Sequence, residues 1–224
     1  MPIPRRIPRP RLLLLLAALA TPCIAAPEPP AAAAFDADWI LQAVARPAPS
    51  RTPFVELRAS PMLRQPLRLQ GEYRREADGR LVRQVIAPYA ETTTLAAGEA
   101  VIERAGRAPR RIALQQVPEL AAVQAGFGAL LAGDRALLLR TYEVRAEGTR
   151  ERWTLGLTPR DPRLAAALRG IELHGRGSEL RCVESTPAKG ELQRTLMAGA
   201  AAAASGIADP SGLAALCHGD GAAR

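Results

Sequence analysis

Histidine and cysteine are scarce in this sequence, so few positions could support metal binding or nucleophilic catalysis. The chain of 224 residues contains two histidines and three cysteines. A Cys–His metal site would have to combine Cys182, Cys217 and His218, which lack the paired close spacings typical of zinc sites. His174 lies before Gly175 at the end of an expected strand. The pattern favours histidines at the surface or at the end of an element, and we predict no metal site.

Motifs for other kinds of chemistry do not occur. The sequence has no G-x-S-x-G nucleophile elbow, and its few serines and histidines form no triad pattern. Residues 175–177 (Gly-Arg-Gly) lack the third glycine and the following helix of a phosphate-binding loop, which indicates a turn. Carboxylates such as Glu72, Glu76 and Asp78 alternate with arginines, and pairing with these arginines is favoured over acid–base roles. We therefore predict a protein that is not an enzyme and needs no cofactor.

The first 25 residues have the composition of an export signal. Four arginines within residues 1–11 precede an apolar run over residues 12–20. This run is shorter than the roughly 20 residues of a membrane-spanning helix, and the small residues up to Ala25 suit cleavage there. We expect a signal peptide over 1–25 and no transmembrane segment in the mature chain. Lipid modification of Cys23 is the alternative, which the preceding Pro22 disfavours.

Cleavage changes what the charge and the cysteines imply. Losing four arginines lowers the formal net charge from +8 to +4, and the other arginines alternate with acidic residues. No nucleic-acid partner is therefore expected. Cys182 and Cys217 form an even pair once Cys23 is removed, as is common in oxidising compartments. A disulfide would tie the C-terminal segment to a late strand, and two free thiols are the alternative, because sequence does not supply the required geometry.

The mature chain divides into a linker, a folded region and a tail. Residues 26–34 are rich in Pro and Ala, and Asp36 is a good N-cap for a helix that ends before Pro47. From Pro53 apolar residues alternate with polar ones, and Asp78-Gly79 indicates a hairpin. We expect strands at 53–58, 67–74, 81–86, 91–95, 99–104, 110–115, 143–146, 152–157, 171–174, 180–184 and 192–197, and helices at 118–131, 134–142 and 161–170. Residues 198–224 are rich in Ala and Gly and are expected to be a tail.

This order of elements predicts one α+β domain, a large antiparallel sheet with helices on one face. Such a sheet can bury its inner face incompletely and leave an apolar groove for an acyl chain, in which each buried CH₂ contributes about 0.8 kcal/mol. A fully packed core without a cavity is the alternative, and the strand pattern alone favours it.

Several short segments resemble one known family. Residues 54–58 (FVELR) are similar to an early strand with the pattern F-x-E/Q, and residues 66–73 (PLRLQGEY) to a following G-x-L/Y strand. Residues 118–120 (PEL), 131–134 (LAGD) and 153–159 (WTLGLTP) are similar to a related branch. Over about residues 35–197 the chain thus resembles the LolA-like outer-membrane lipoprotein carriers of the Gram-negative periplasm.

The resemblance implies a fold and a function. It implies a curved antiparallel unclosed β-barrel (a half-barrel), with short helices covering one face as a lid over an apolar cavity. The domain over 35–197 would be a periplasmic carrier of the acyl chains of lipoproteins or related lipids. Its partners would be this cargo, an inner-membrane donor and an outer-membrane acceptor. The helix over 118–131 is the lid candidate, and an ordinary packing helix is the alternative.

We expect the cavity to be lined by Leu57, Leu69, Tyr73, Leu81, Val85, Ile112, Leu114, Phe127, Leu131, Trp153, Leu155 and Leu157. Carriers of the main type often have an Arg-Pro pair between two early strands, and this Arg is tied to lid closure. Here Ala77-Asp78 occupies that place, and neither Arg75 nor Arg80 is assigned to the role. The alternative function is an exported scaffold or adaptor that binds a partner protein through a sheet edge and holds no ligand.

Overall fold

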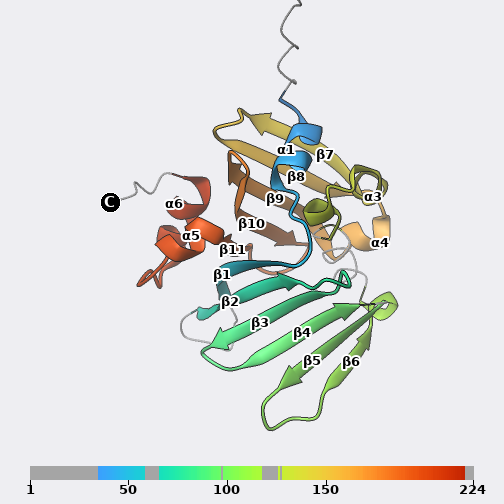
Figure 1. Cartoon of the computed structure of the whole chain (residues 1–224), viewed down its shortest axis with the longest axis vertical. Coiled ribbons are helices and arrows are strands. Elements are labelled where there is room, and N and C mark those ends of the chain that lie inside the picture. The colour runs from blue at the N-terminus through green and yellow to red at the C-terminus, as the bar shows by residue number, and fades with distance from the viewer. Residues whose placement is uncertain (1–34, 59–65, 97, 118–125, 127, 220–224) are drawn as a thin grey trace, which may run out of the picture. The chain divides into compact units, whose positions relative to one another are not determined.

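One antiparallel sheet of eleven strands dominates the protein (Figure 1). The structure is a computed structural model that describes residues 35–58, 66–96, 98–117, 126 and 128–219. The predicted signal peptide and linker, residues 1–34, lie outside the described residues. The expected α+β class with a curved, unclosed antiparallel sheet is confirmed.

The strands follow the alternating pattern of the sequence closely, but the helix expected at 161–170 ends at Ala165 and a strand begins at Leu168. The strands are β1 (Ser50–Arg58), β2 (Leu67–Arg75), β3 (Leu81–Ala87), β4 (Glu91–Ala96), β5 (Glu99–Arg104), β6 (Arg110–Ala113), β7 (Tyr142–Gly148), β8 (Trp153–Pro159), β9 (Leu168–Arg176), β10 (Glu179–Pro187) and β11 (Gln193–Met197). The helices are α1 (Ala37–Val44), α3 (Arg135–Thr141), α4 (Pro162–Ala165), α5 (Ala198–Ala203) and α6 (Pro210–His218), with a 3₁₀ turn, η1, at Leu114–Gln116.

The sheet consists of two meanders. The first runs from β1 to β6 and the second from β7 to β11, and the pairing of β1 with β11 joins them. The strand order is β6-β5-β4-β3-β2-β1-β11-β10-β9-β8-β7, so β1 pairs with β11 and places Phe54 opposite Met197. Strands β6 and β7 are the two edges of this sheet. Pairing of β1 with β11 therefore brings residues of both meanders to one continuous face.

Turn and cap residues act where the sequence predicts them. Asp36 accepts a hydrogen bond from the Trp39 amide at the start of α1, and Asp134 does the same from Leu137 at the start of α3. Gly79 turns the β2–β3 hairpin with φ of 84°, a backbone conformation that favours glycine. These local signals explain why element positions could be predicted well.

The main core lies on one face of the sheet, called here the inner face. Figure 1 shows α1 beside β7–β9 on this face. Ile40 and Leu41 from α1 pack with Trp153 and Leu155 of β8, and Leu138 of α3 joins them. These side chains are buried, with Trp153 only 1% exposed. The second meander carries most of the apolar burial on the inner face.

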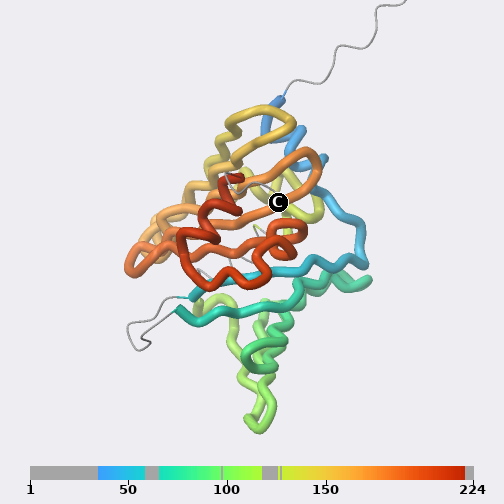
Figure 2. The backbone as a smooth tube through the Cα atoms, turned by 90° about the vertical axis from the view of Figure 1, so that its left-hand side faces the viewer, coloured from blue at the N-terminus to red at the C-terminus, as the bar shows by residue number. Residues whose placement is uncertain are grey.

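The opposite, outer face is covered by two helices that the sequence does not predict. Figure 2 shows α5 and α6 in front of the strands, where Ala200, Ala204 and Leu213 pack on Val55 and Leu57. In place of the expected tail, residues 198–219 are largely helical and belong to the folded unit. Alanine side chains are small, so they let a helix lie close to the sheet. None of the described helices combines the length and hydropathy that crossing a bilayer requires.

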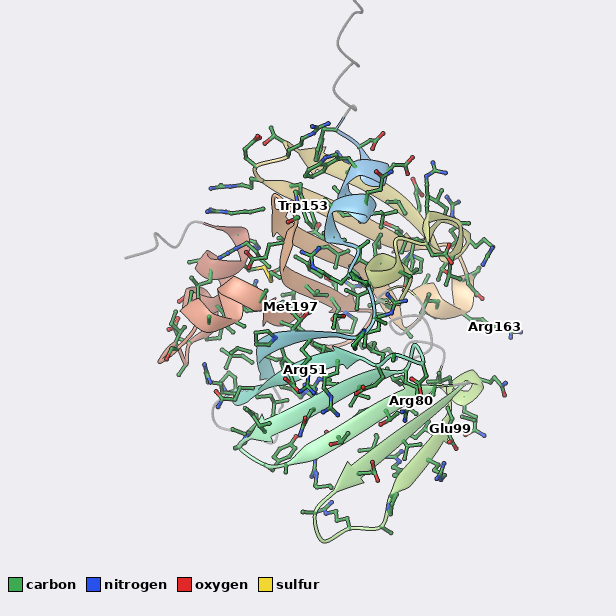
Figure 3. All side chains as sticks on the ribbon, viewed as in Figure 1. Arg51, Arg80, Glu99, Trp153, Arg163 and Met197 are labelled. Carbon is green, nitrogen blue, oxygen red and sulfur yellow. A yellow bond between two sulfur atoms is a disulfide. The ribbon has the colours of Figure 1, made fainter. Side chains whose placement is uncertain are left out.

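A disulfide fixes the second of these helices to the sheet. Cys182 on β10 is bonded to Cys217 on α6, and both side chains are buried. The sulfur pair is visible beside α6 in Figure 3. The C-terminal helix is therefore covalently attached to the outer face.

Candidate functional site

The inner face contains a cavity of about 470 Å³. It lies where the two meanders meet, and its walls come from β1–β5 on one side and β9–β11 on the other. Its lining residues are Glu56, Arg58, Tyr73, Leu81, Arg83, Glu91, Thr93, Leu95, Ile102, Ala167, Leu168, Ile171, Val183, Ser185, Pro187, Gln193, Thr195 and Met197. A volume of this size falls within the range of roughly 300–1,000 Å³ that small-molecule pockets occupy.

Strand register explains why these side chains share one space. Glu56 on β1 is opposite Thr195 on β11, and Thr195 is in turn opposite Val183 on β10. Directly paired residues of antiparallel strands point to the same side of the sheet. The lining therefore continues across the β1–β11 junction, where Met197 is labelled in Figure 3.

Most of the cavity wall is hydrocarbon. Leu81, Leu95 and Ile102 line it from the first meander, and Ile171 and Met197 from the second. Such a wall binds apolar ligand surface through the hydrophobic effect, which is non-directional and scales with the area removed from water.

A buried charged group interrupts this apolar wall. Glu56 is 4% exposed. Its Oε2 accepts a hydrogen bond from Arg83 Nη2 at 2.8 Å, and its Oε1 accepts one from Arg58 Nη2 at 2.9 Å. One carboxylate thus engages both arginines that line the cavity.

Aromatic rings pack against the guanidinium group of Arg83. The Arg83 guanidinium carbon lies 4.6 Å from the centre of the Phe54 ring, and Phe54 contacts Tyr73 with ring centres 4.9 Å apart. Burial raises the pKa of Tyr73 above its ordinary value, although Arg83 acts in the opposite direction. Burial lowers the pKa of Arg83, but Tyr73 and Glu56 outweigh it, so the net shift is upward. At neutral pH the cavity therefore contains a neutral phenol and a charged guanidinium.

A second ion pair involves the lining residue Glu91. Its Oε2 accepts a hydrogen bond from Arg104 Nη2 at 2.5 Å, and the Arg104 guanidinium carbon lies 4.2 Å from the centre of the Tyr89 ring. Each of the two lining glutamates is thus neutralised by arginine.

Two of the twelve predicted lining residues, Tyr73 and Leu81, line the cavity. Trp153, Leu155 and Leu157 are instead packed under α1 and α3 in the main core. They point to the inner face as expected, but helices cover that part of it. The cavity lies closer to the pairing of β1 with β11 than these three residues of β8 do.

Most of the other predicted residues belong to smaller packed clusters. Leu69 and Val85 pack against Phe54, and Leu114 and Leu131 pack with Ile112. Their side chains lie on the inner face, but they pack against neighbouring side chains and do not line the cavity.

Leu57 points away from the cavity, because it contacts the helices of the outer face. Strand β1 is buried on both faces, with Phe54, Val55, Glu56 and Leu57 all covered. Apolar alternation therefore marks Val55 and Leu57 as inward, whereas the inward positions are Phe54 and Glu56. The adjacent apolar residues Phe54 and Val55 point to opposite faces of the sheet, and they were the available signal that both faces of β1 are buried.

The lid candidate falls largely outside the described residues, and so does Phe127. Its last turn is described, and Arg75 Nη1 donates hydrogen bonds there to the Leu131 carbonyl at 3.3 Å and to the Arg46 carbonyl at 2.9 Å. Arg80 instead pairs with Asp78 within the β2–β3 hairpin, at 2.6 Å. Of the two arginines, Arg75 is the one that connects the early strands to this helical end.

The outer face brings together the two histidines. His174 on β9 and His218 on α6 both contact Glu184 on β10, which is buried. The sequence pattern treats them as separate surface or end-of-element residues, because nothing local indicates that α6 returns to β9. Among the described residues, these three side chains and the disulfide-bonded Cys217 form the group with metal-ligating atoms close together.

Comparisons with known proteins identify a matching family and several similar solved structures. Residues 29–221 match the family described as outer membrane lipoprotein carrier protein LolA-like. A LolA superfamily protein from Nitrosomonas europaea is 17% identical, with 72% of this chain and 76% of that chain covered at a TM-score of 0.37. A chain of the Pseudomonas aeruginosa MucA/MucB complex is 20% identical, with 71% and 53% covered at a TM-score of 0.36.

LprF from Mycobacterium bovis is 12% identical, with 72% of this chain and 91% of that chain covered at a TM-score of 0.32. No curated protein matches this chain. The family match spans most of the sequence, from residue 29 to residue 221. The protein therefore belongs to the family of LolA-like outer membrane lipoprotein carrier proteins.

Proposed function

We propose that this protein is a periplasmic carrier that binds the acyl chains of a lipoprotein or a related lipid in the inner-face cavity. The observation that carries the proposal is the cavity of about 470 Å³ with its mainly hydrocarbon wall. Membership of a lipoprotein-carrier family supports the same function. Binding of this kind needs neither a cofactor nor a reaction, and we propose a non-enzymatic role.

Hydrophobic transfer provides enough free energy for such binding. Each CH₂ group moved from water into an apolar site contributes about 0.8 kcal/mol. Leu81, Leu95, Ile102, Ile171 and Met197 provide that site. An acyl chain exposed to the periplasm would therefore be shielded from water while the carrier moves between an inner-membrane donor and an outer-membrane acceptor.

The paired charges favour acyl chains in ester or amide linkage over free fatty acids. Glu56 engages both Arg58 and Arg83, and Glu91 is paired with Arg104. A free carboxylate would have to displace Glu56 from its arginines. Esterified chains, as in lipoproteins and glycerolipids, carry no such charge at the acyl end.

Filling the cavity tests the proposal. Val183 lines the cavity on β10, and Val101 on β5 is paired with Thr94 and Arg111 on the face that points away from it. The variants Val183→Phe and Val101→Phe make the same change on opposite sides of the sheet. Uptake of a fluorescent acyl ester should weaken at least tenfold in Val183→Phe, and Val101→Phe should bind like the unchanged protein.

Circular dichroism must first show that both variants are folded. A second variant that blocks the cavity is Ile102→Trp, which fills it from β5. Equal uptake by all of these proteins would contradict the proposal. Absence of uptake in the unchanged protein would also contradict it and would favour the scaffold or adaptor function.

A further inference from the structure

Three side chains from distant parts of the chain meet beneath α6 on the outer face. His174 Nε2 lies 3.2 Å from Oε2 of Glu184, and His218 Nε2 lies 3.3 Å from the same oxygen. The histidine rings contact each other edge to face, with centres 5.0 Å apart. Two imidazole nitrogens therefore converge on one carboxylate oxygen.

The two nitrogen–oxygen spacings match those of a metal coordination shell. Zinc binds imidazole nitrogen and carboxylate oxygen at about 2.0–2.2 Å with tetrahedral geometry, which places neighbouring ligand atoms about 3.3 Å apart. The three ligand atoms lie within 4.8 Å of one another. Small movements of the two rings would thus admit an ion between them.

The surroundings hold two of these side chains in a ligating arrangement. Nδ1 of His174 lies 3.3 Å from Thr154 Oγ1, so its second ring nitrogen has a hydrogen-bond partner. Arg194 Nε donates to Oε1 of Glu184 at 2.5 Å, which leaves Oε2 to face the histidines. Partners of this kind orient metal ligands in known sites.

Glu184 is an anion in this environment. It is 4% exposed and forms an ion pair with Arg194, which keeps it charged. A buried carboxylate kept ionised can offset the charge of a bound cation.

A cleft of about 210 Å³ lies beside the two histidines. It is lined by His174 and His218 together with Thr154, Arg152 and Arg176, among others. An ion can reach the two histidines from solvent through this cleft. The arginines on its wall favour an anionic fourth ligand, such as chloride or phosphate.

We propose that His174, His218 and Glu184 form a binding site for a divalent transition-metal ion of the zinc class. Two imidazoles and one carboxylate suit zinc, copper, iron or nickel, whereas magnesium and calcium prefer oxygen ligands. Cys217 contributes no thiolate, because its sulfur is in the disulfide. The ion would join α6 to β9 and β10, beside the covalent attachment of α6.

The experiment uses the mature chain with its disulfide intact, treated with EDTA and then dialysed. Calorimetric titration with ZnCl₂ should give one site per chain with a dissociation constant of micromolar or tighter, and MgCl₂ should give none. Zinc should also raise the thermal unfolding temperature. A Co²⁺-loaded sample should show the visible absorption bands of tetrahedral coordination.

Variants identify the ligands. His218 is 43% exposed at the end of α6, so His218→Ala should fold normally and bind zinc at least tenfold more weakly. Glu184→Gln should show the same loss, whereas Glu147→Gln, a matched change on β7, should bind like the unchanged protein. Near-UV circular dichroism confirms that each variant is folded.

Absence of a single zinc site would overturn the proposal, as would binding that survives both His218→Ala and Glu184→Gln. In either case His174, Glu184 and His218 form a hydrogen-bonded cluster only. Acyl uptake takes place on the other face of the sheet and is measured separately, so failure here is distinguishable from failure of the carrier function.

Discussion

Arg83 donates a hydrogen bond to Glu56 at 2.8 Å inside a cavity whose wall is mainly hydrocarbon. Both side chains are largely withdrawn from solvent, since the side chain of Arg83 is 14% exposed and that of Glu56, taken without its backbone, is 6% exposed. Removing one partner of a buried pair leaves an uncompensated charge, which is more costly than the pair itself. The pair therefore affects both the stability of the sheet and the kind of ligand that the cavity accepts.

Glu56→Gln should change ligand preference and stability together. Without the carboxylate, Arg83 and Arg58 are free to bind an anion, and a charge-assisted hydrogen bond contributes about 1.5–3 kcal/mol. Affinity for a free fatty acid, relative to its methyl ester, should rise about tenfold. Denaturant unfolding should show a loss of roughly 3 kcal/mol.

The matched control is Glu103→Gln, which changes an exposed glutamate on β5. It should alter neither the preference nor the stability. An unchanged preference in Glu56→Gln would mean that the two arginines do not face the ligand.

Affinity should depend on acyl chain length in a defined way. Each added CH₂ contributes about 0.8 kcal/mol, or roughly a fourfold gain in affinity, while the cavity has room. Beyond the length that fills it, further CH₂ groups stay in water and the gain should stop. Competition binding with esters of increasing length measures both the slope and the plateau. Affinity that does not vary with length would contradict binding in an apolar cavity of fixed size.

Loss of the disulfide should destabilise the protein without abolishing acyl binding. Cys182 and Cys217 are 35 residues apart in sequence, and the chain-entropy relation gives about 4 kcal/mol for closing such a loop. The double variant Cys182→Ala/Cys217→Ala should unfold at correspondingly lower denaturant, and amide exchange in α6 should increase. Acyl uptake should persist, because α6 lies on the outer face. A stability change below about 1 kcal/mol would contradict the predicted role of the disulfide.

Gly175 should tolerate no side chain. A Cβ atom at this position would lie 2.0 Å from Cζ2 of Trp153, the buried ring labelled in Figure 3. Gly175→Ala should therefore lower the free energy of unfolding by about 2 kcal/mol or more, as overpacking of a core does.

Gly128→Ala is the control, because its Cβ would meet no atom within 4 Å. In a helix this change should stabilise by up to about 1 kcal/mol. Equal thermal unfolding temperatures for the two variants would count against the Trp153 contact.

The arrangement of the strands could be predicted because their signals are local. Alternation of apolar and polar residues, the Asp78-Gly79 turn and the capping residue Asp134 each depend on a few neighbouring residues. The lining of the cavity could not be predicted in the same way. Which face of β1 is inward depends on α5 and α6, and these helices lie more than 100 residues further along the chain.

The helix α5 and the histidine contact on the outer face could not be predicted for the same reason, because both depend on contacts between distant parts of the chain. Alanine-rich residues 198–204 have little hydrophobic surface of their own, so composition indicates a tail, yet α5 is buried against β1 and β10. The contact of His174 with His218 exists only because α6 packs back onto the sheet. Spacing in the sequence carries no signal for either arrangement.

The central claim is that the inner-face cavity holds an acyl chain, and native mass spectrometry with lipid extraction of the purified protein tests it most directly. A population of the protein should be heavier by the mass of one acylated molecule, and the extract should contain acyl species. The same measurement on Val183→Phe should give the protein alone. Protein that carries no acyl species, even after incubation with lipid, would contradict the account.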